Sequence, residues 1–255
     1  MRYCSLGSGS KGNATVIEHG GTRLLVDCGF SLRSTEQRLA VAGLHASQLT
    51  AILVTHEHSD HVHGVEKLAR RYNLPVFMTA GTRHALGLGT EGIETLALDR
   101  SIEIGDLRVE SVAVPHDARE PCQFIVENDT TRFGLLTDTG MITPWIIERY
   151  QQLDGLLLEA NYDPDMLASG PYPPRLKARV GGQHGHLSNQ QAAGLLAELD
   201  RQRLKHLAVA HISEKNNHPD LARDALSGVL ADWSGQLLVA CQNQGLPWQP
   251  IHQAA

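Results

Sequence analysis

The sequence predicts an α/β domain in which helices cover β-sheets. Short apolar runs of strand length alternate with helical stretches along the chain, without an internal repeat or a low-complexity tract. Of the 255 residues, 42% are hydrophobic and 20% are charged, which is ordinary globular usage and enough to bury a sizeable core. We therefore expect a single domain spanning residues 1–255, and we exclude disordered, collagenous and coiled-coil chains.

Each expected element follows from its local pattern. The first third predicts a hairpin of strands 14–18 and 22–27, a helix between Ser31 and Gly43, a buried strand at 51–55, a helix at 62–72 and a strand at 75–79. The middle predicts strands at 107–114, 123–127, 131–136 and 155–159, with a helix at 144–151. Residues 162–185 are rich in proline and glycine, and we expect an irregular loop there. A capping box at 188–191 opens a helix to Leu199, followed by a strand at 204–210, a helix at 220–230 and a strand at 236–240.

The net charge, the apolar runs and the cysteines limit the possible partners and the cellular location of the protein. A net charge of −6 argues against a protein that coats nucleic acid by bulk charge, although a local basic groove stays possible. No run approaches the roughly 20 apolar residues of a membrane-spanning helix, and the first residues do not form a secretory signal. We expect a cytoplasmic protein without membrane contact, and its four scattered cysteines buried and reduced. The oligomeric state is not indicated.

Histidine is unusually frequent, with 14 residues, and several crowd into residues 55–61 (THEHSDH). This segment follows a buried strand directly and precedes a helix. His56 and His58 are two residues apart and can point to the same side. Asp60 and His61 follow them and can face a second binding position. Imidazole and carboxylate together suit zinc, manganese or iron, so the segment predicts a metal site.

The same segment resembles the HxHxDH signature of metallo-β-lactamase fold hydrolases. That resemblance implies an αββα sandwich, in which two mixed β-sheets pack face to face with helices outside. It also implies further ligands after later strands, and His116, Asp138 and His211 fit. One metal would take His56, His58 and His116, the other would take Asp60, His61 and His211, and Asp138 would bridge them. Two divalent ions, zinc or manganese, can hold a hydroxide between them and clamp both oxygens of an in-line displacement.

Other residues point to a phosphate substrate. His186 lies just before a helix N-terminus, where it can protonate a leaving alkoxide, and we expect it and Asp60 to be catalytic. Residues 7–13 can form a backbone nest for phosphate, and Asp27 is expected to brace the ligand loop. The expected substrate contacts are Ser10, Asn13, Arg175, Lys177, Ser188 and Asn217.

A closer resemblance covers nearly the whole chain. It is carried by residues 5–13 (SLGSGSKGN), 25–29 (LVDCG), 158–163 (LEANYD), 170–173 (GPYP), 185–189 (GHLSN) and 211–217 (HISEKNN), which resemble the YycJ-like (WalJ) subgroup of this fold. That resemblance implies a cytoplasmic, metal-dependent DNA exonuclease acting from 5′ ends, with RNA as a further possible substrate. The His186 segment is also similar to RNase Z. The glutamate that RNase Z carries before its bridging aspartate is missing from residues 134–137, so we expect no such proton relay.

Two alternatives stay open at this point. The same metal core serves hydrolases of small phosphodiesters, thioesters or lactones, and a pocket too narrow for a nucleic-acid strand would favour one of these. A metal-stabilised regulatory protein without catalysis is the second alternative, although a structural zinc is usually closed by four ligands.

Overall fold

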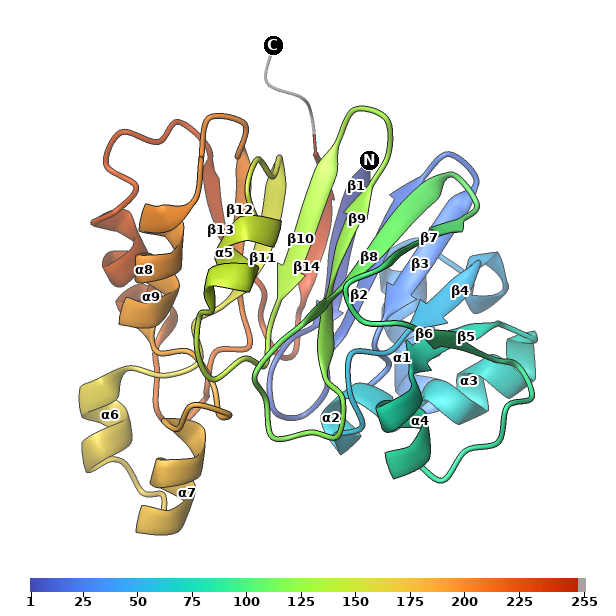
Figure 1. Ribbon diagram of the computed structural model, residues 1–255, viewed down its shortest axis with the longest axis horizontal. Helices are drawn as coiled ribbons and strands as arrows, with labels where there is room; N and C mark the ends of the chain where they lie inside the picture. The colour runs from blue at the N-terminus through green and yellow to red at the C-terminus, as the bar shows by residue number, and fades with distance from the viewer. Residues whose placement is uncertain (252–255) are drawn as a thin grey trace.

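A computed structural model of the protein describes residues 1–251 and places two seven-stranded β-sheets face to face (Figure 1). In spatial order, the first sheet contains β14 (Leu246–Pro250), β1 (Arg2–Gly7), β2 (Ala14–His19), β3 (Thr22–Val26), β4 (Ala51–Leu53), β5 (Val76–Thr79) and β6 (Ile93–Leu96). The second contains β13 (Gln236–Val239), β12 (His206–Ala210), β11 (Gly155–Glu159), β10 (Arg132–Leu136), β9 (Cys122–Glu127), β8 (Leu107–Ala113) and β7 (Ser101–Ile104).

Both sheets are mixed. In the first, the strands from β14 to β3 pair antiparallel and those from β3 to β6 pair parallel. In the second, the strands from β7 to β10 pair antiparallel and those from β10 to β13 pair parallel. The expectation of two mixed sheets is therefore confirmed.

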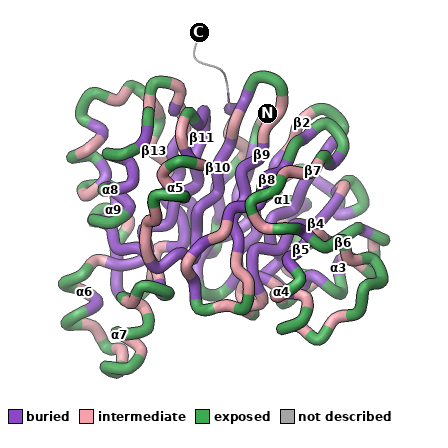
Figure 2. Tube along the Cα trace, in the orientation of Figure 1, coloured by how far each residue is buried: buried purple, intermediate pink, exposed green. Residues whose placement is uncertain are grey.

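Helices lie around the two sheets (Figure 1). They are α1 (Leu32–Val41), α2 (Ser59–Val62), α3 (Val65–Tyr72), α4 (Ala80–Ala85), α5 (Pro144–Arg149), α6 (Pro164–Ser169), α7 (Pro174–Val180), α8 (Asn189–Glu198) and α9 (Pro219–Ser227), with a 3-10 turn at Ala46–Gln48. One apolar core lies between the sheets, a second under α5, α8 and α9, and a third under α1 and α3. Figure 2 shows the strands buried and the helices exposed on their outer sides. This is the four-layer sandwich that the resemblance implied.

The parallel strands set the position of the site. Strands that run parallel bring their carboxyl ends to the same edge of a sheet, where ligands bind in open α/β sheets. Asp27 follows β3, Asp138 follows β10 soon after its end, and His211 follows β12 directly. Residues far apart in the chain therefore meet at one edge of the sandwich.

Several expectations were wrong. Residues 162–185 are not an irregular loop, because they contain α6 and α7. Each helix begins with a proline, which is tolerated in the first turn because its missing N–H has no helical acceptor there. The strands β1 and β14, which pair at the edge of the first sheet, were not expected from the sequence. Three cysteines are buried as expected, but Cys241 is exposed.

Among residues 1–251, no helix combines the length and apolar character needed to cross a membrane.

Candidate metal centre

The segment that runs from the end of β4 into α2 holds four of the predicted ligands, with His56 and His58 in the loop and Asp60 and His61 in α2. His56 and His61 are fully buried within it. Asp27 fixes this loop, because its Oδ1 accepts from the Thr55 amide at 2.9 Å and its Oδ2 from His61 Nδ1 at 2.7 Å. With Nδ1 engaged by Asp27, His61 keeps Nε2 for a metal. These contacts agree with the bracing role expected of Asp27.

His56, His58 and His116 form the first cluster, in which one ligand atom of each lies within 4.8 Å of the others. Each ring has one nitrogen held by the protein. His116 Nδ1 donates to the Gly185 carbonyl at 2.9 Å, and His58 Nε2 donates to the Asp117 carbonyl at 3.2 Å. The remaining nitrogens, His116 Nε2 and His58 Nδ1, lie 3.3 Å apart. Such outer hydrogen bonds fix the tautomer and free the second nitrogen as a ligand.

Burial also keeps this cluster in its ligating form. Burial lowers the pKa of His56 well below its usual value, with the neighbouring His61 adding to the effect. The pKa of His116 is likewise lowered by burial. A metal binds neutral imidazole, so these shifts favour metal binding at neutral pH.

The second cluster gathers Asp60, His61, Asp138 and His211. The Oδ2 atom of Asp60 lies 3.5 Å from His61 Nε2 and 3.9 Å from His211 Nε2. Burial opposes the charged form of His211, but Asp138 and Glu159 outweigh burial and raise its pKa to about 10. The negative charges of Asp138 and Glu159 therefore favour a positive charge beside His211. A bound divalent ion would supply such a charge.

Asp138 lies between the two clusters. One of its oxygens lies 3.1 Å from His211 Nδ1 and 4.0 Å from His116 Nε2, and the other lies 3.3 Å from His61 Nε2. Asp138 Oδ2 and His56 Nε2 are buried without a hydrogen-bond partner in the described part of the chain. Unpaired buried polar atoms of these types, aimed at one another, fit divalent ions as their missing partners.

Three residues of the site have unusual backbone conformations. Asp27, Asp138 and His211 have φ values of 60°, 50° and 52°, in the left-handed region. Non-glycine residues rarely adopt this region, and when they do they concentrate at functional sites. The sharp turn after each strand carries its side chain toward the shared edge.

His186 lies beside the second cluster, and a residue that the sequence analysis missed holds it. His186 Nδ1 lies 2.7 Å from Oε1 of Glu159, the last residue of β11. Glu159 Oε1 also lies 3.3 Å from His211 Nδ1. The glutamate that RNase Z carries is absent from residues 134–137, and Glu159 contacts His186 from another strand instead. The available signal was a single acidic residue ending an apolar strand.

A cavity of about 200 Å³ opens over the second cluster. Its walls include the expected residues Ser10, His58, Asp60, Asp138, His186 and His211, together with Asn161, Ser213 and four residues from the α6–α7 segment. Asn13 lies below this cavity, and its Nδ2 is 3.1 Å from His61 Nε2 and 3.3 Å from Asp60 Oδ2.

The structure does not bring every expected substrate contact to the cavity. Ser188 is buried, and its hydroxyl caps α8 by accepting from the Gln191 amide. Asn217 is buried and donates to the Ala160 carbonyl at 2.9 Å. Arg175 and Lys177 lie on α7 outside the cavity lining, and Lys177 Nζ donates to the Ala168 carbonyl at 2.5 Å.

Residues 7–13 do not form the expected phosphate nest. The Gly9 amide donates to the Asn13 side chain at 2.8 Å, and the Lys11 amide donates to the Gln242 side chain at 2.7 Å. The Gly12 amide donates back to the Gly9 carbonyl at 3.0 Å. These three amides already donate to acceptors within the protein. They are therefore not available to bind an anion.

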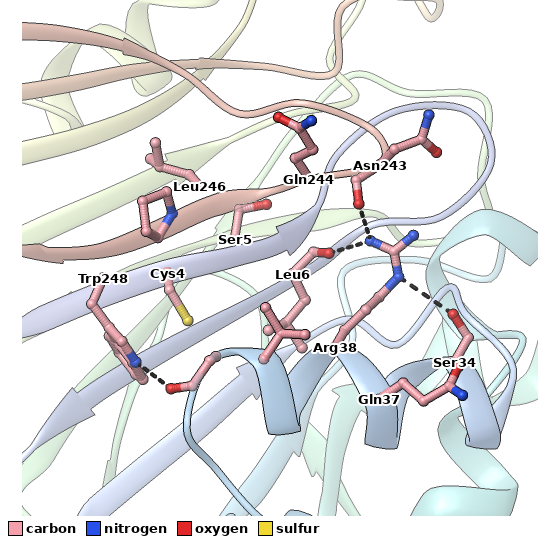
Figure 3. Close-up of a pocket in the computed structure, with 13 residues that line it drawn as sticks. Cys4, Ser5, Leu6, Ser34, Gln37, Arg38, Asn243, Gln244, Leu246 and Trp248 are labelled. Carbon is pink, nitrogen blue, oxygen red and sulfur yellow. Dashed lines mark hydrogen bonds between the residues drawn. The ribbon is translucent and has the colours of Figure 1, made fainter.

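A larger cavity of about 530 Å³ lies away from the metal centre, between α1 and the paired strands β1 and β14. Figure 3 shows Arg38 at one end of it, donating to the carbonyls of Leu6 and Asn243. Trp248 lies at the other end and donates to the Ala42 carbonyl. This cavity holds no cluster of acidic or histidine side chains and carries no metal chemistry.

The sandwich and its histidine–aspartate clusters define a hydrolase-type metal site on a metallo-β-lactamase fold. Residues 22–212 match the family model of the beta-lactamase superfamily domain, and the chain belongs to that superfamily. Within it, the chain belongs to the YycJ/WalJ family. It is 35% identical to exodeoxyribonuclease YycJ of Bacillus anthracis, over 91% of this chain and 90% of that protein. It is also 35% identical to exodeoxyribonuclease WalJ of Streptococcus pneumoniae, over 91% of this chain and 88% of that protein.

A solved structure supports the fold independently. The metallo-beta-lactamase fold protein YhfI from Bacillus subtilis superimposes with a TM-score of 0.75, covering 98% of this chain and 99% of that chain. The two sequences are only 16% identical, so this likeness concerns the fold alone.

Proposed function

We propose that this protein is a metal-dependent exodeoxyribonuclease that acts from 5′ ends with two divalent ions, zinc or manganese. The observation that carries the proposal is Asp138, whose two carboxylate oxygens reach histidines of both clusters. Its relatives YycJ and WalJ bear the name exodeoxyribonuclease and match nearly the whole chain, which supports DNA as the substrate.

The ligand assignment follows the contacts. His56, His58 and His116 would hold one ion, Asp60, His61 and His211 would hold the other, and Asp138 would serve both sites. When bound, the ions supply Lewis acidity and a nucleophile for in-line attack on phosphorus. Asn13 steadies Asp60, because its side-chain amide donates to Asp60 Oδ2 at 3.3 Å.

His186 is the group that handles the leaving oxygen. Its Nδ1 faces Glu159, which leaves Nε2 as the nitrogen able to give a proton to a departing alkoxide. Glu159 fixes the tautomer and the orientation of that ring. We also assign Asp60 to the catalytic machinery, because its Oδ2 lies 3.5 Å from His61 Nε2 and 3.9 Å from His211 Nε2, where it would share their ion.

The substrate reaches the ions over the cavity rim. Ser10 contributes to that rim, and Arg175 and Lys177 lie beyond it on α7, where they can meet the DNA backbone. We assign Ser188 and Asn217 to the support of the loop that carries His186, because their polar atoms are engaged within the protein. Cytoplasmic location and the use of RNA stay predictions.

The test is degradation of end-labelled, 5′-phosphorylated duplex DNA with added manganese or zinc, beside the Asp138→Ala variant. Shortening from the 5′ end by the wild type alone supports the proposal. A chelator should abolish this activity, and readdition of the metal should restore it. Absence of cleavage in a protein carrying two ions per chain would overturn the nuclease assignment in favour of a small phosphodiester, thioester or lactone.

A further inference from the structure

The segment formed by α6, α7 and their connection makes one wall of the cavity over the metal centre. Figure 1 shows these two short helices together, beyond the carboxyl ends of β11 and β12. Tyr172, Leu176, Arg179 and Val180 are the residues that this wall contributes to the cavity. None of them is among the metal-ligand clusters or the expected substrate contacts.

Arg179 is the permanently charged cation of the cavity lining. Its Nε donates to Asp117, the residue after the ligand His116. Both Nη groups are without a hydrogen-bond partner among residues 1–251, and the side chain is more than half exposed. The guanidinium is thus anchored at one corner beside the metal centre and keeps its remaining donors for a ligand.

Tyr172 lies in the connection between α6 and α7 and lines the same cavity. The ring is partly exposed, and its hydroxyl has no hydrogen-bond partner in the described range. Lys215, on the loop that follows His211, lies 5.9 Å from the ring centre. Lys215 lies over one face of the ring, and Tyr172 is part of the cavity wall with its hydroxyl uncommitted within the described residues.

We propose that Tyr172 and Arg179 form a nucleotide-recognition wall, in which Arg179 binds a phosphate beside the scissile bond and Tyr172 stacks on a base. The inference rests on the proposed nuclease function and specifies how that site takes its substrate. Guanidinium groups bind phosphates in a forked geometry, and aromatic rings stack on bases without regard to sequence. A phosphate donor and a stacking ring on one wall fit the two chemical parts of a nucleotide.

The size of the cavity agrees with this role. At about 200 Å³ it is smaller than the roughly 300–1,000 Å³ pockets that enclose whole small molecules. Under the proposed function, only the terminal part of a strand would enter it, and a base that stacks on Tyr172 would have left its neighbours in a duplex. Such a site favours an unpaired end, because an unpaired base costs least to move out of its stack.

The test compares single-stranded oligonucleotides of one sequence. One is unmodified, and two carry an abasic nucleotide at the first or second position from the 5′ end. Tyr172→Ala should slow degradation of the unmodified strand roughly 5- to 150-fold, the range expected for loss of one stacked base. One of the abasic strands should slow the wild type by a similar factor, and on that strand the variant should equal the wild type. Tyr172→Phe should keep nearly full activity, since the ring rather than the hydroxyl does the stacking.

Phosphate binding by Arg179 is tested by inhibition with a nucleoside monophosphate, the expected reaction product. Thymidine 5′-monophosphate should inhibit the wild type, and Arg179→Ala should weaken that inhibition about tenfold or more while metal content stays normal. Arg70→Ala is the matched control, because Arg70 is an exposed arginine on α3, outside the cavity lining.

The outcomes separate the two proposals. Equal loss for Tyr172→Ala on unmodified and abasic strands would assign the ring a structural role and overturn the inference, as would unchanged product inhibition in Arg179→Ala. A wild type that binds metal yet degrades no strand would instead overturn the nuclease function.

Discussion

Nδ1 of His186 lies 2.7 Å from Oε1 of Glu159, a fully buried carboxylate at the end of β11. The same oxygen lies 3.3 Å from His211 Nδ1, so one glutamate contacts both the expected acid and an expected metal ligand. Burial disfavours the ionised form of Glu159, but the charge and hydrogen bond of His186, with help from His211, hold its pKa below the usual range. An ionised carboxylate in this position fixes the orientation of both rings.

Glu159→Gln should therefore reduce turnover while leaving the fold intact. Glutamine has the same shape, but it lacks the negative charge and the second carboxylate oxygen with which Glu159 holds the His186 and His211 rings. We expect kcat to fall about 10- to 100-fold, the usual range for partners of this kind. Steady-state kinetics and metal analysis check this. A variant with full kcat and normal metal content would show that the contact with Glu159 does not matter for the reaction.

Asp27→Asn should act on metal binding. Asp27 is buried, and it holds both the Thr55 amide and His61 Nδ1. The amide retains one acceptor but loses the charge that raises the basicity of His61, so metal affinity should fall about 10- to 100-fold. Competition with a chelating dye measures this affinity. Asp106→Asn is a suitable control, because Asp106 holds only the turn at Gly21 and Thr22, and it should bind metal normally.

Thiol chemistry should distinguish Cys241 from the other cysteines. Burial raises the pKa of Cys4 to about 12 and that of Cys28 to about 11, and it also raises the pKa of Cys122. Because the thiolate is the reactive form, only the exposed Cys241 should react quickly with a disulfide reagent at pH 8. The other three should react once the chain unfolds, and Cys241→Ser should remove the fast phase.

The same thiols predict a loss of stability in alkali. An unfolded cysteine ionises near pH 9, whereas the folded thiols keep their protons to higher pH. The free energy of unfolding contributed by this difference is complete below pH 9 and declines as the pH rises from 9 toward 11. Denaturant titrations across that range measure the slope. An increase of stability with pH there would contradict the assignment.

The expected ligands His56, His58, Asp60 and His61 came from one local segment, whereas His116, Asp138 and His211 came from the resemblance to the fold family. A buried apolar strand followed at once by a histidine or aspartate appears at His56 and His211, and nearly so at His116 and Asp138. Such a pattern places the side chain at a sheet edge whatever the details of packing. Glu159 follows the same logic, but an acidic residue after an apolar strand is ordinary unless a neighbouring histidine is known to face it.

The parts that sequence reasoning missed depend on long-range contacts. β1 and β14 stabilise one another across the whole length of the chain, and neither has a strong pattern of its own. The α6 and α7 helices begin at prolines that are equally typical of loops. The phosphate nest failed for a similar reason, since the acceptor of the Lys11 amide is Gln242. That the whole chain is one domain stays a prediction.

Gly29 provides a steric test of how tightly the ligand loop is packed. A Cβ atom at this position would lie 1.7 Å from the Asp60 carbonyl oxygen and 2.8 Å from the Asn13 amide nitrogen. Both neighbours are backbone atoms, and they are hydrogen bonded to each other at 2.8 Å, so neither can move without displacing the loop.

Gly29→Ala should therefore lower both stability and metal content. Overpacking of this kind costs about 1–3 kcal/mol, which corresponds to a fall in Tm of roughly 3–10 °C. Displacement of Asp60 should also weaken metal binding about tenfold or more. Gly194→Ala is the matched control, because Gly194 lies within α8 with no atom within 4 Å of the added methyl group, and alanine there favours the helix by about 1 kcal/mol. If Gly29→Ala kept the Tm and metal content of the wild type, the backbone of residues 59–61 would be able to yield, and the close packing of Gly29 against Asp60 would not define the metal site.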